Sequence, residues 1–196
     1  MHGLINRSLQ GFLRDTYGAA TWANVAREAR LGFDGFEPML SYDPALTEAV
    51  VAAAARTLNR PSESVLEDLG TYLVSHPNTE RVRRLLRFGG ESYDDFVHSL
   101  EDLPERARLA LPDLNLPGLD LVEHGEGRYQ LFITAPLVGA GHVMMGLLRA
   151  MADDYGALVL MEPLANDGGA EVIQIQLLDQ RHSSGRQFDL VGQSVP

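Results

Sequence analysis

The spacing of hydrophobic residues changes at Pro117, and this change limits the folds that the chain can adopt. Before Pro117, apolar residues recur every three to four positions, which is the spacing of helices with one buried face. After Pro117, short apolar segments alternate with polar residues, as in the strands of a half-buried sheet. We therefore expect an α+β domain, in which a helical N-terminal part packs on an antiparallel sheet with one inserted helix.

Local signals place the boundaries of these elements. Helices are expected at residues 4–17, 22–29, 44–58, 61–76, 81–88, 93–100, 104–111 and 137–155, and strands at residues 119–124, 130–134, 157–161 and 171–177. Asp43-Pro44 is typical of a helix start, because aspartate caps the first turn and proline fits its first position. Asn166-Asp-Gly-Gly169 predicts a tight hairpin turn between the last two strands.

The length of the chain, 196 residues, suits one domain with a sizeable core. We expect this domain to span residues 1–181. A helical subdomain would cover about residues 1–60, and about residues 61–181 would form a second subdomain with the pocket and the sheet. Residues 182–196 are rich in Ser, Gly, Arg and Gln, which favours a solvated tail.

The composition excludes several classes of partner and site. The formal net charge of −11 would repel nucleic acid and anionic membrane surfaces. The chain contains no cysteine, which excludes disulfides and thiolate ligation of a metal or heme. No apolar run is long enough for a membrane-spanning helix, and the N-terminus lacks the apolar core of a signal peptide. We expect a cytoplasmic protein without nucleic-acid or membrane partners.

Several short motifs occur in an order that points to one family. The N-terminus reads Met-His-Gly-Leu-Ile-Asn-Arg-Ser-Leu, Tyr17-Gly18 precedes Trp22, and Val51 precedes three alanines. The segment from residue 92 to residue 119 carries further matches, which are Phe96, Leu100, Asp102, Leu103, Pro112, Leu114 and Pro117. In this order and spacing, the motifs resemble those of heme-nitric-oxide/oxygen-binding (H-NOX) domains, from residue 1 to about residue 178.

The resemblance implies a heme site, but the residues that should form it are replaced. In the family, a histidine on a helix ligates the iron, and Pro104 stands at its position here. The family's Tyr-x-Ser-x-Arg clamp for the heme propionates falls on Ile133, Ala135 and Leu137. Proline has no lone pair to ligate iron, and leucine cannot bind a carboxylate as arginine does. We therefore expect neither heme nor a metal at this site.

The resemblance also indicates which residues should line the vestigial pocket. We expect them to be Ile5, Pro104, Pro112, Ile133, Ala135, Leu137 and His142. Because the clamp replacements are apolar, the pocket would be either filled by side chains or open to a small apolar ligand. Two histidines remain candidates for displaced heme ligation, namely His142 beside the pocket and His98 on the helix that precedes Pro104.

No catalytic constellation is visible in the sequence, and we do not expect an enzyme. The chain has no phosphate-binding loop and no His-Glu-x-x-His zinc motif. The neighbouring pairs Asp94-Asp95 and Asp153-Asp154 are more typical of a solvated helix surface than of an acid–base pair. A basic run fits either a solvated helix face or a docking patch for an acidic partner, and consists of Arg81, Arg83, Arg84 and Arg87.

The preferred hypothesis is a non-enzymatic regulatory module with the H-NOX fold and without heme. The resemblance implies a protein partner, such as a histidine kinase or a cyclic-nucleotide enzyme. The alternative is a heme-based sensor of NO or O₂ whose axial ligand is His142 or His98.

Overall fold

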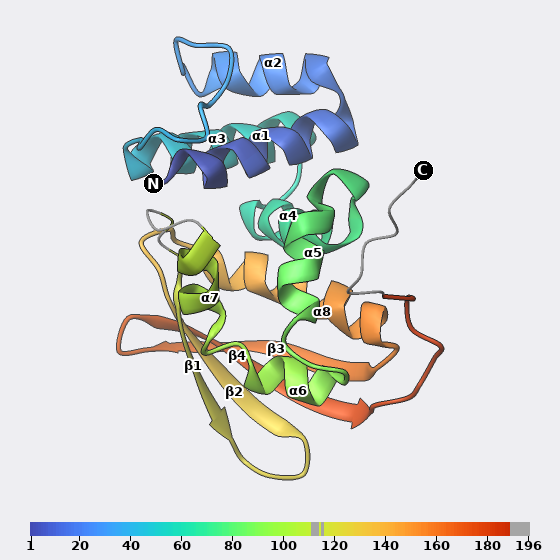
Figure 1. The fold of residues 1–196 in the computed structure, drawn as a ribbon. Coiled ribbons are helices and arrows are strands. Elements are labelled where there is room, and N and C mark those ends of the chain that lie inside the picture. The colour runs from blue at the N-terminus through green and yellow to red at the C-terminus, as the bar shows by residue number, and fades with distance from the viewer. Residues whose placement is uncertain (111–113, 115, 189–196) are drawn as a thin grey trace, which may run out of the picture.

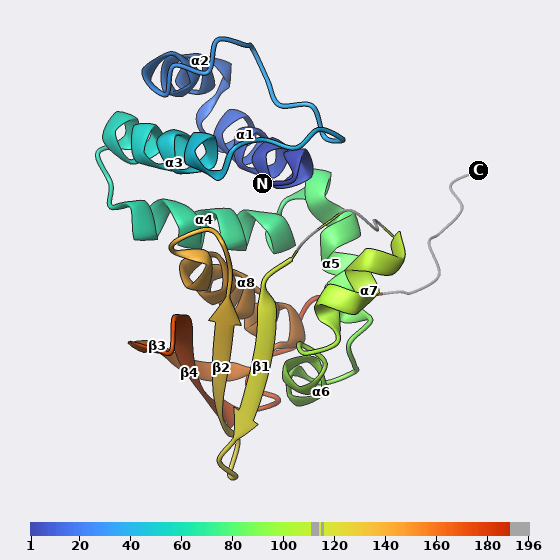
Figure 2. The same cartoon turned by 90° about the vertical axis from the view of Figure 1, so that its left-hand side faces the viewer.

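The computed structural model describes residues 1–110, 114 and 116–188, and it has the expected α+β architecture (Figures 1 and 2). The first part of the chain forms the helices α1 (Gly3–Tyr17), α2 (Ala19–Glu28), α3 (Pro44–Leu58) and α4 (Ser62–Ser75). The short 3-10 helix η1 (Pro77–Thr79) leads into α5 (Glu80–Arg87), α6 (Tyr93–His98) and α7 (Leu103–Ala110). The remaining elements are β1 (Gly118–Glu123), β2 (Arg128–Thr134), α8 (Ala140–Tyr155), β3 (Leu158–Asp167) and β4 (Ala170–Asp179).

The helices and the sheet form successive layers (Figure 2). α1–α3 lie on one side of α4, α8 packs on its other side, and the sheet lies beyond α8. The sheet is antiparallel throughout, with the strand order β1-β2-β4-β3. α6 and α7 lie beside β1, where the carboxylate of Glu101 accepts a hydrogen bond from the backbone N–H of Leu121. Among the described residues, no helix is both long and apolar enough to cross a membrane.

Two hydrophobic clusters hold these layers together, and α4 contributes to both. The first cluster lies among α1–α4 and includes Leu13 and Leu66. The second fills the space between α8 and the sheet, and Val74 joins it from the C-terminal end of α4. In the sheet, Leu131 of β2 faces Ile173 of β4, so alternate residues of both strands point into this second cluster.

Two helices begin three residues away from the expected positions, and a glycine sets each of these starts. α2 begins at Ala19 rather than at residue 22, directly after Gly18, whose φ of 92° ends α1. α8 begins at Ala140 rather than at residue 137, because Gly139 adopts a left-handed φ of 86°. β3 is longer than expected and continues past Pro163. An edge strand tolerates proline, because a backbone N–H on the outer side of the strand would have no partner in the sheet.

The C-terminal residues differ from the expected solvated tail over part of their length. Residues 183–188 lie against α8 and α5, and their backbone is hydrogen-bonded to both helices. Most of their side chains are exposed, which agrees with their polar composition, and it is their backbone that makes the specific contacts. Residues 189–196 lie outside the described residues.

α4 and α8 cross so closely that their backbones meet at two glycines. A Cβ atom on Gly70 would lie 2.0 Å from the carbonyl oxygen of Val143. A Cβ atom on Gly146 would lie 1.9 Å from the carbonyl oxygen of Glu67. Both obstacles are backbone atoms, which no side-chain rotation can move. Glycine at these two positions therefore permits the close approach of the two helices.

We predict that Gly146→Ala destabilises the domain by about 1–3 kcal/mol or more, because α8 must move away from α4 to admit the methyl group. Urea or thermal unfolding measures the change. Gly118→Ala is the matched control, since its Cβ would lie 3.7 Å from the nearest atom, an ordinary contact distance. Equal unfolding midpoints for the two variants would contradict the close approach of the helices.

Candidate functional site

Pro104 is the second residue of α7, and its side chain is buried. Proline is tolerated in the first turn of a helix, because the N–H groups there have no partner within the helix. α7 therefore begins without a break at the position where the resemblance places the family's iron ligand. The pyrrolidine ring offers no lone pair to a metal, so Pro104 cannot ligate iron.

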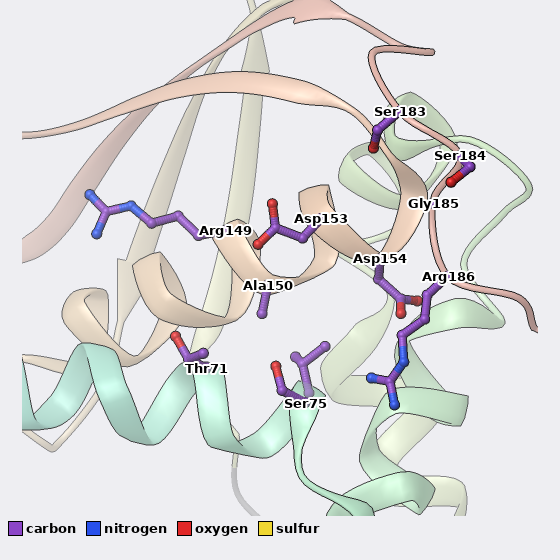
Figure 3. A pocket seen from close by; sticks show the side chains of 11 residues that line it. Thr71, Ser75, Arg149, Ala150, Asp153, Asp154, Ser183, Ser184, Gly185 and Arg186 are labelled. Atoms are coloured by element: carbon purple, nitrogen blue, oxygen red, sulfur yellow. The ribbon is translucent and has the colours of Figure 1, made fainter.

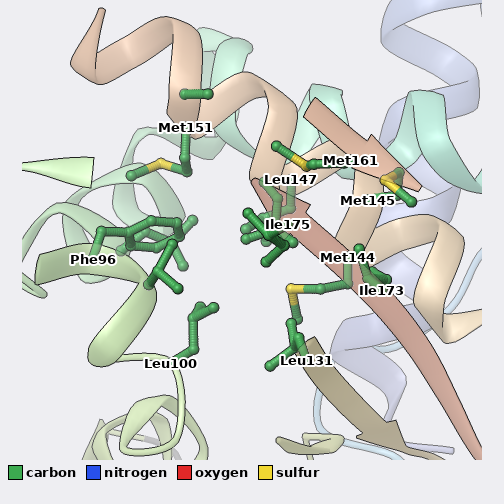
Figure 4. Close-up of a cluster of buried hydrophobic side chains, with 14 of the residues drawn as sticks. Phe96, Leu100, Leu131, Met144, Met145, Leu147, Met151, Met161, Ile173 and Ile175 are labelled. Atoms are coloured by element: carbon green, nitrogen blue, oxygen red, sulfur yellow. The ribbon is translucent and has the colours of Figure 1, made fainter. Parts of the chain in front are cut away.

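Ile133 and Ala135 lie at the C-terminal end of β2 and directly after it, and both pack into the cluster between α8 and the sheet. Only 1% of Ile133 is exposed, and the residue faces Leu119 of β1 across the strand pair. Leu103, which precedes Pro104, is buried in the same cluster. Figure 4 shows further side chains of this cluster, from α6, α8 and the sheet, pointing toward one another. Two of the clamp positions and the start of α7 thus belong to packed core.

Leu137 and His142 lie elsewhere, in an open cleft of about 550 Å³ between α3, the first turns of α4 and the loop that leads into α8. The cleft has an apolar part and an acidic part. The apolar side chains are Val51, Ala52, Leu66, Leu137 and Val138. The acidic side chains are Glu48, Glu63 and Glu171.

Glu171 of β4 reaches the start of α8 and holds it. Its carboxylate accepts hydrogen bonds from the backbone N–H groups of Gly139 and Gly141, at 2.8 and 3.0 Å. A Cβ atom on Gly141 would lie 2.7 Å from a carboxylate oxygen of Glu171, so glycine leaves room for this contact. The N–H groups at the start of a helix need such acceptors, and they attract negative charge.

His142 contacts a side chain of α4. Its Nδ1 lies 3.3 Å from a carboxylate oxygen of Glu67. The other carboxylate oxygen of Glu67 accepts a hydrogen bond of 2.6 Å from Arg149, two turns further along α8. Glu67 therefore bridges two positions on the same face of α8. Among the described residues, the Nε2 atom of His142 makes no hydrogen bond.

His98 lies at the end of α6 and has partners for both ring nitrogens. Its Nδ1 lies 2.9 Å from the backbone carbonyl of Asp94, and its Nε2 lies 3.3 Å from a carboxylate oxygen of Glu123 on β1. The imidazole also makes an edge contact with the ring of Tyr129, whose hydroxyl donates to Asp94. The Asp94 carbonyl and the Glu123 carboxylate raise the pKa of His98 above its usual 6.5.

The remaining expected pocket residues are not brought to this cleft. Ile5 is half-buried on α1, and it lines neither this cleft nor the groove described next. Pro112 lies outside the described residues. The structure thus brings Leu137 and His142 together in the cleft, places Ile133 and Ala135 in the core, and leaves His98 beside β1.

A second, smaller groove of about 340 Å³ lies between α4, the C-terminal half of α8 and the segment that follows β4 (Figure 3). Its lining includes Thr71 and Ser75 from α4, Asp153 from α8, and residues 183–186. None of the residues expected from the sequence as pocket positions lines this groove.

The residues present do not fit a heme held as in the H-NOX pattern. No imidazole stands at the start of α7, and Ile133 fills the first clamp position with a buried apolar side chain. Leu137 lines a cleft that also carries Glu63 and Glu171, and these carboxylates would repel the heme propionates. Neither the iron nor the propionates would find their usual partners.

Sequence reasoning missed Glu67 and Glu171, which organise this region. A signal for Glu171 exists: it is a charged residue on the face of β4 that otherwise carries Ile173 and Ile175. Gly139-Ala-Gly141 also marks a helix start that lacks a capping side chain of its own. The pairing of Glu67 with α8 has no comparable signal, because it depends on how α4 and α8 cross.

Comparisons with known proteins agree with this architecture. The family model described as "Haem-NO-binding" matches residues 2–162. Soluble guanylate cyclase gcy-31 of Caenorhabditis elegans is 21% identical over 154 residues, which cover 79% of this chain and 22% of that protein. Soluble guanylate cyclase 89Db of Drosophila melanogaster is 18% identical over 81% of this chain and 24% of its own length. The chain therefore spans less than a quarter of the length of these relatives.

Solved structures show the same fold. An H-NOX protein from S. oneidensis in the Fe(II)NO ligation state has a TM-score of 0.76 and 17% identity, with 91% of this chain and 100% of that chain covered. A mutant of the T. tengcongensis H-NOX has a TM-score of 0.75 and 12% identity, with 92% of this chain and 99% of that chain covered.

We predict that Glu171→Gln lowers the free energy of unfolding by about 0.5–2 kcal/mol, because the start of α8 loses a charged acceptor. Thermal or urea unfolding measures this loss. Glu162→Gln on β3 is the control, since that side chain is exposed and does not contact a helix end. The role of Glu171 is refuted when both substitutions shift the midpoint equally.

We predict that the His98 contacts stabilise the fold at low pH and that this stabilisation fades as the pH rises. A raised pKa means that the folded state binds a proton more tightly than the unfolded state. The contribution is therefore complete below the unfolded pKa of about 6.5 and is lost as the pH passes through the raised folded value. Unfolding curves of the unmodified chain and of His98→Gln, recorded between about pH 5 and pH 8, measure the difference in their free energies of unfolding. A difference that stays constant over this range would contradict the prediction.

Proposed function

Because the chain belongs to the haem-NO-binding family, we propose that it is a regulatory module of this family that holds no heme at the family's site and catalyses no reaction. The module acts by contact with a protein partner. A small apolar molecule in the cleft beside Leu137 is its candidate ligand.

The observation that carries this proposal is Pro104 at the start of α7. A histidine-ligated heme needs an imidazole on a helix that faces the iron. Proline is compatible with the first turn of the helix but cannot ligate iron, so the helix can form here without a heme ligand.

The clamp positions support the same conclusion. Ile133 and Ala135 exchange hydrogen-bonding side chains for apolar ones that pack into the core. Burying these groups contributes stability that a polar pocket without its ligand would lack. An apolar core at this place is what a domain needs when no cofactor fills the space.

The proposal of a protein partner rests on the relatives. They are named soluble guanylate cyclases, and their chains are far longer than this one. A partner of the cyclic-nucleotide enzyme kind is therefore the first candidate, and a histidine kinase is the second. Contact with either requires no chemistry in the domain itself.

The apolar part of the cleft supports the proposal of a ligand. Its wall combines Val51 and Leu66 with Leu137, and such an apolar wall suits a small uncharged molecule. The carboxylates of Glu48 and Glu63 at the same cleft disfavour an anionic ligand.

A heme-based gas sensor with a displaced axial ligand is the second candidate function, and one observation favours it. His142 lines the cleft, and its Nε2 makes no hydrogen bond among the described residues. His98 is the weaker alternative ligand, because both of its ring nitrogens already have partners.

We predict that the chain, expressed with heme supplied in excess, purifies without stoichiometric iron and without the Soret band of an imidazole-ligated heme. Visible absorption and iron analysis measure this. Pro104→His restores the ligand while the propionates remain unclamped, so it should take up heme weakly at most.

His142→Ala and His98→Ala separate the two candidate functions, and His124→Ala serves as a control because His124 is exposed in the turn between β1 and β2. A stoichiometric Soret band that disappears in His142→Ala or His98→Ala, and persists in His124→Ala, would establish displaced ligation and overturn the heme-free proposal.

A further inference from the structure

Residues 183–188, which we call the strap, run along the C-terminal end of α8 and across α5. The N–H of Ser183 donates to the carbonyl of Gly156 at 3.0 Å, and the N–H of Arg186 donates to the carbonyl of Asp154 at 2.8 Å. The carbonyl of Gln187 accepts a hydrogen bond of 3.1 Å from the guanidinium of Arg83 on α5. The strap lies beyond residue 162, where the family match ends.

The strap covers a buried group of charges between α5 and α8. Arg83 donates through Nε to Asp154 at 2.9 Å, and the two side chains are 6% and 2% exposed. Arg87, one turn further along α5, lies 3.7 Å from the second carboxylate oxygen of Asp154. Two guanidinium groups therefore share one buried carboxylate, and Nη1 of Arg83 also lies 3.4 Å from a carboxylate oxygen of the more exposed Glu80.

Aromatic rings also lie beside both guanidinium groups. The guanidinium carbon of Arg87 lies 3.9 Å from the ring centre of Tyr155 on α8 and 5.0 Å from the ring centre of Phe188 in the strap. The guanidinium of Arg83 lies 5.4 Å from the Phe188 ring. A cation beside aromatic faces is stabilised, most strongly where water is excluded. The strap thus supplies one ring and one carbonyl to the arginines of α5.

The charge group remains only partly satisfied. Among the described residues, Nε and Nη1 of Arg87 and one carboxylate oxygen of Asp154 have no hydrogen-bond partner. Buried charges with missing partners are costly, and water would hydrate them if the strap left. The docked and released states are therefore closer in free energy than the number of strap contacts alone would indicate.

We propose that the surface formed by Arg83, Arg87, Asp154 and Tyr155 is a docking site for the strap, and that the strap is released when α5 and α8 shift relative to each other. The residues that hold the strap come from both helices, so the strap binds only while α5 and α8 keep their present relative position. The hydroxyl of Tyr155 donates to the carbonyl of Gly90 at 2.9 Å and fixes the loop after α5 to α8. The position of the strap then reports the arrangement of these helices, whether or not heme binds.

Hydrogen exchange on the full chain tests the docking. The backbone N–H groups of Ser183 and Arg186 should be protected in the chain, and Phe188→Ala should reduce this protection by about fivefold. The N–H groups of β4 should keep their protection. Gln187→Ala is the matched control, because Gln187 contacts Arg83 only through its backbone carbonyl. Exchange at Ser183 and Arg186 as fast as in an unstructured peptide, or equal exchange in Phe188→Ala and Gln187→Ala, would overturn the docking site.

Tyr155→Phe tests whether the docking of the strap depends on the relative position of α5 and α8. It removes the hydrogen bond to Gly90 and keeps the ring beside Arg87. We expect faster exchange in the strap, with the N–H groups of β4 unchanged. Unchanged exchange in the strap would show that it is docked but does not report the arrangement of α5 and α8, which overturns that part of the proposal. Trypsin cleavage after Arg186 provides an independent readout, since a released strap is cut faster.

Discussion

The backbone contact between α4 and α8 at Gly70 and Gly146 is the constraint on which the rest of the structure depends. α4 closes the cluster of α1–α3 on one side, and through α8 it joins the cluster that covers the sheet. Because the two backbones meet directly, a single crossing sets the distance between the helical part and the sheet. Glu67 secures the same crossing through His142 and Arg149.

The described cavities lie at opposite ends of this helix pair. The cleft with Leu137 adjoins the first turns of α4 and α8, where Glu171 holds the helix start. The groove with Asp153 adjoins their other ends, where the strap crosses α8 (Figure 3). A movement of α8 along α4 would alter both ends together. The candidate ligand site and the proposed strap are thus connected by one rigid element rather than by a chain of side chains.

Apolar side chains pack together at the positions where the resemblance expects part of the heme site. A heme-binding domain uses the macrocycle as part of its core, so its loss would leave a large apolar cavity. Here Ile133 and Leu103 belong to one hydrophobic cluster, Ala135 packs against it, and Pro104 lies in the first turn of α7. Hydrophobic burial holds these elements together.

The sequence by itself determined the α+β class, the order of the elements and the family. Hydrophobic spacing depends only on local periodicity, and helix starts such as Asp43-Pro44 depend on neighbouring residues. It also determined that Pro104 cannot ligate iron, because this follows from the side chain alone. Only the tertiary structure decided which residues from distant parts of the chain lie in contact. Leu137 faces a cleft, whereas Ile133 is buried in the core. Glu171 of β4 accepts hydrogen bonds at the start of α8, and the polar residues 183–188 contact the buried Arg83. These contacts join residues far apart in the chain, and no local pattern encodes the crossing of α4 and α8 that brings them together.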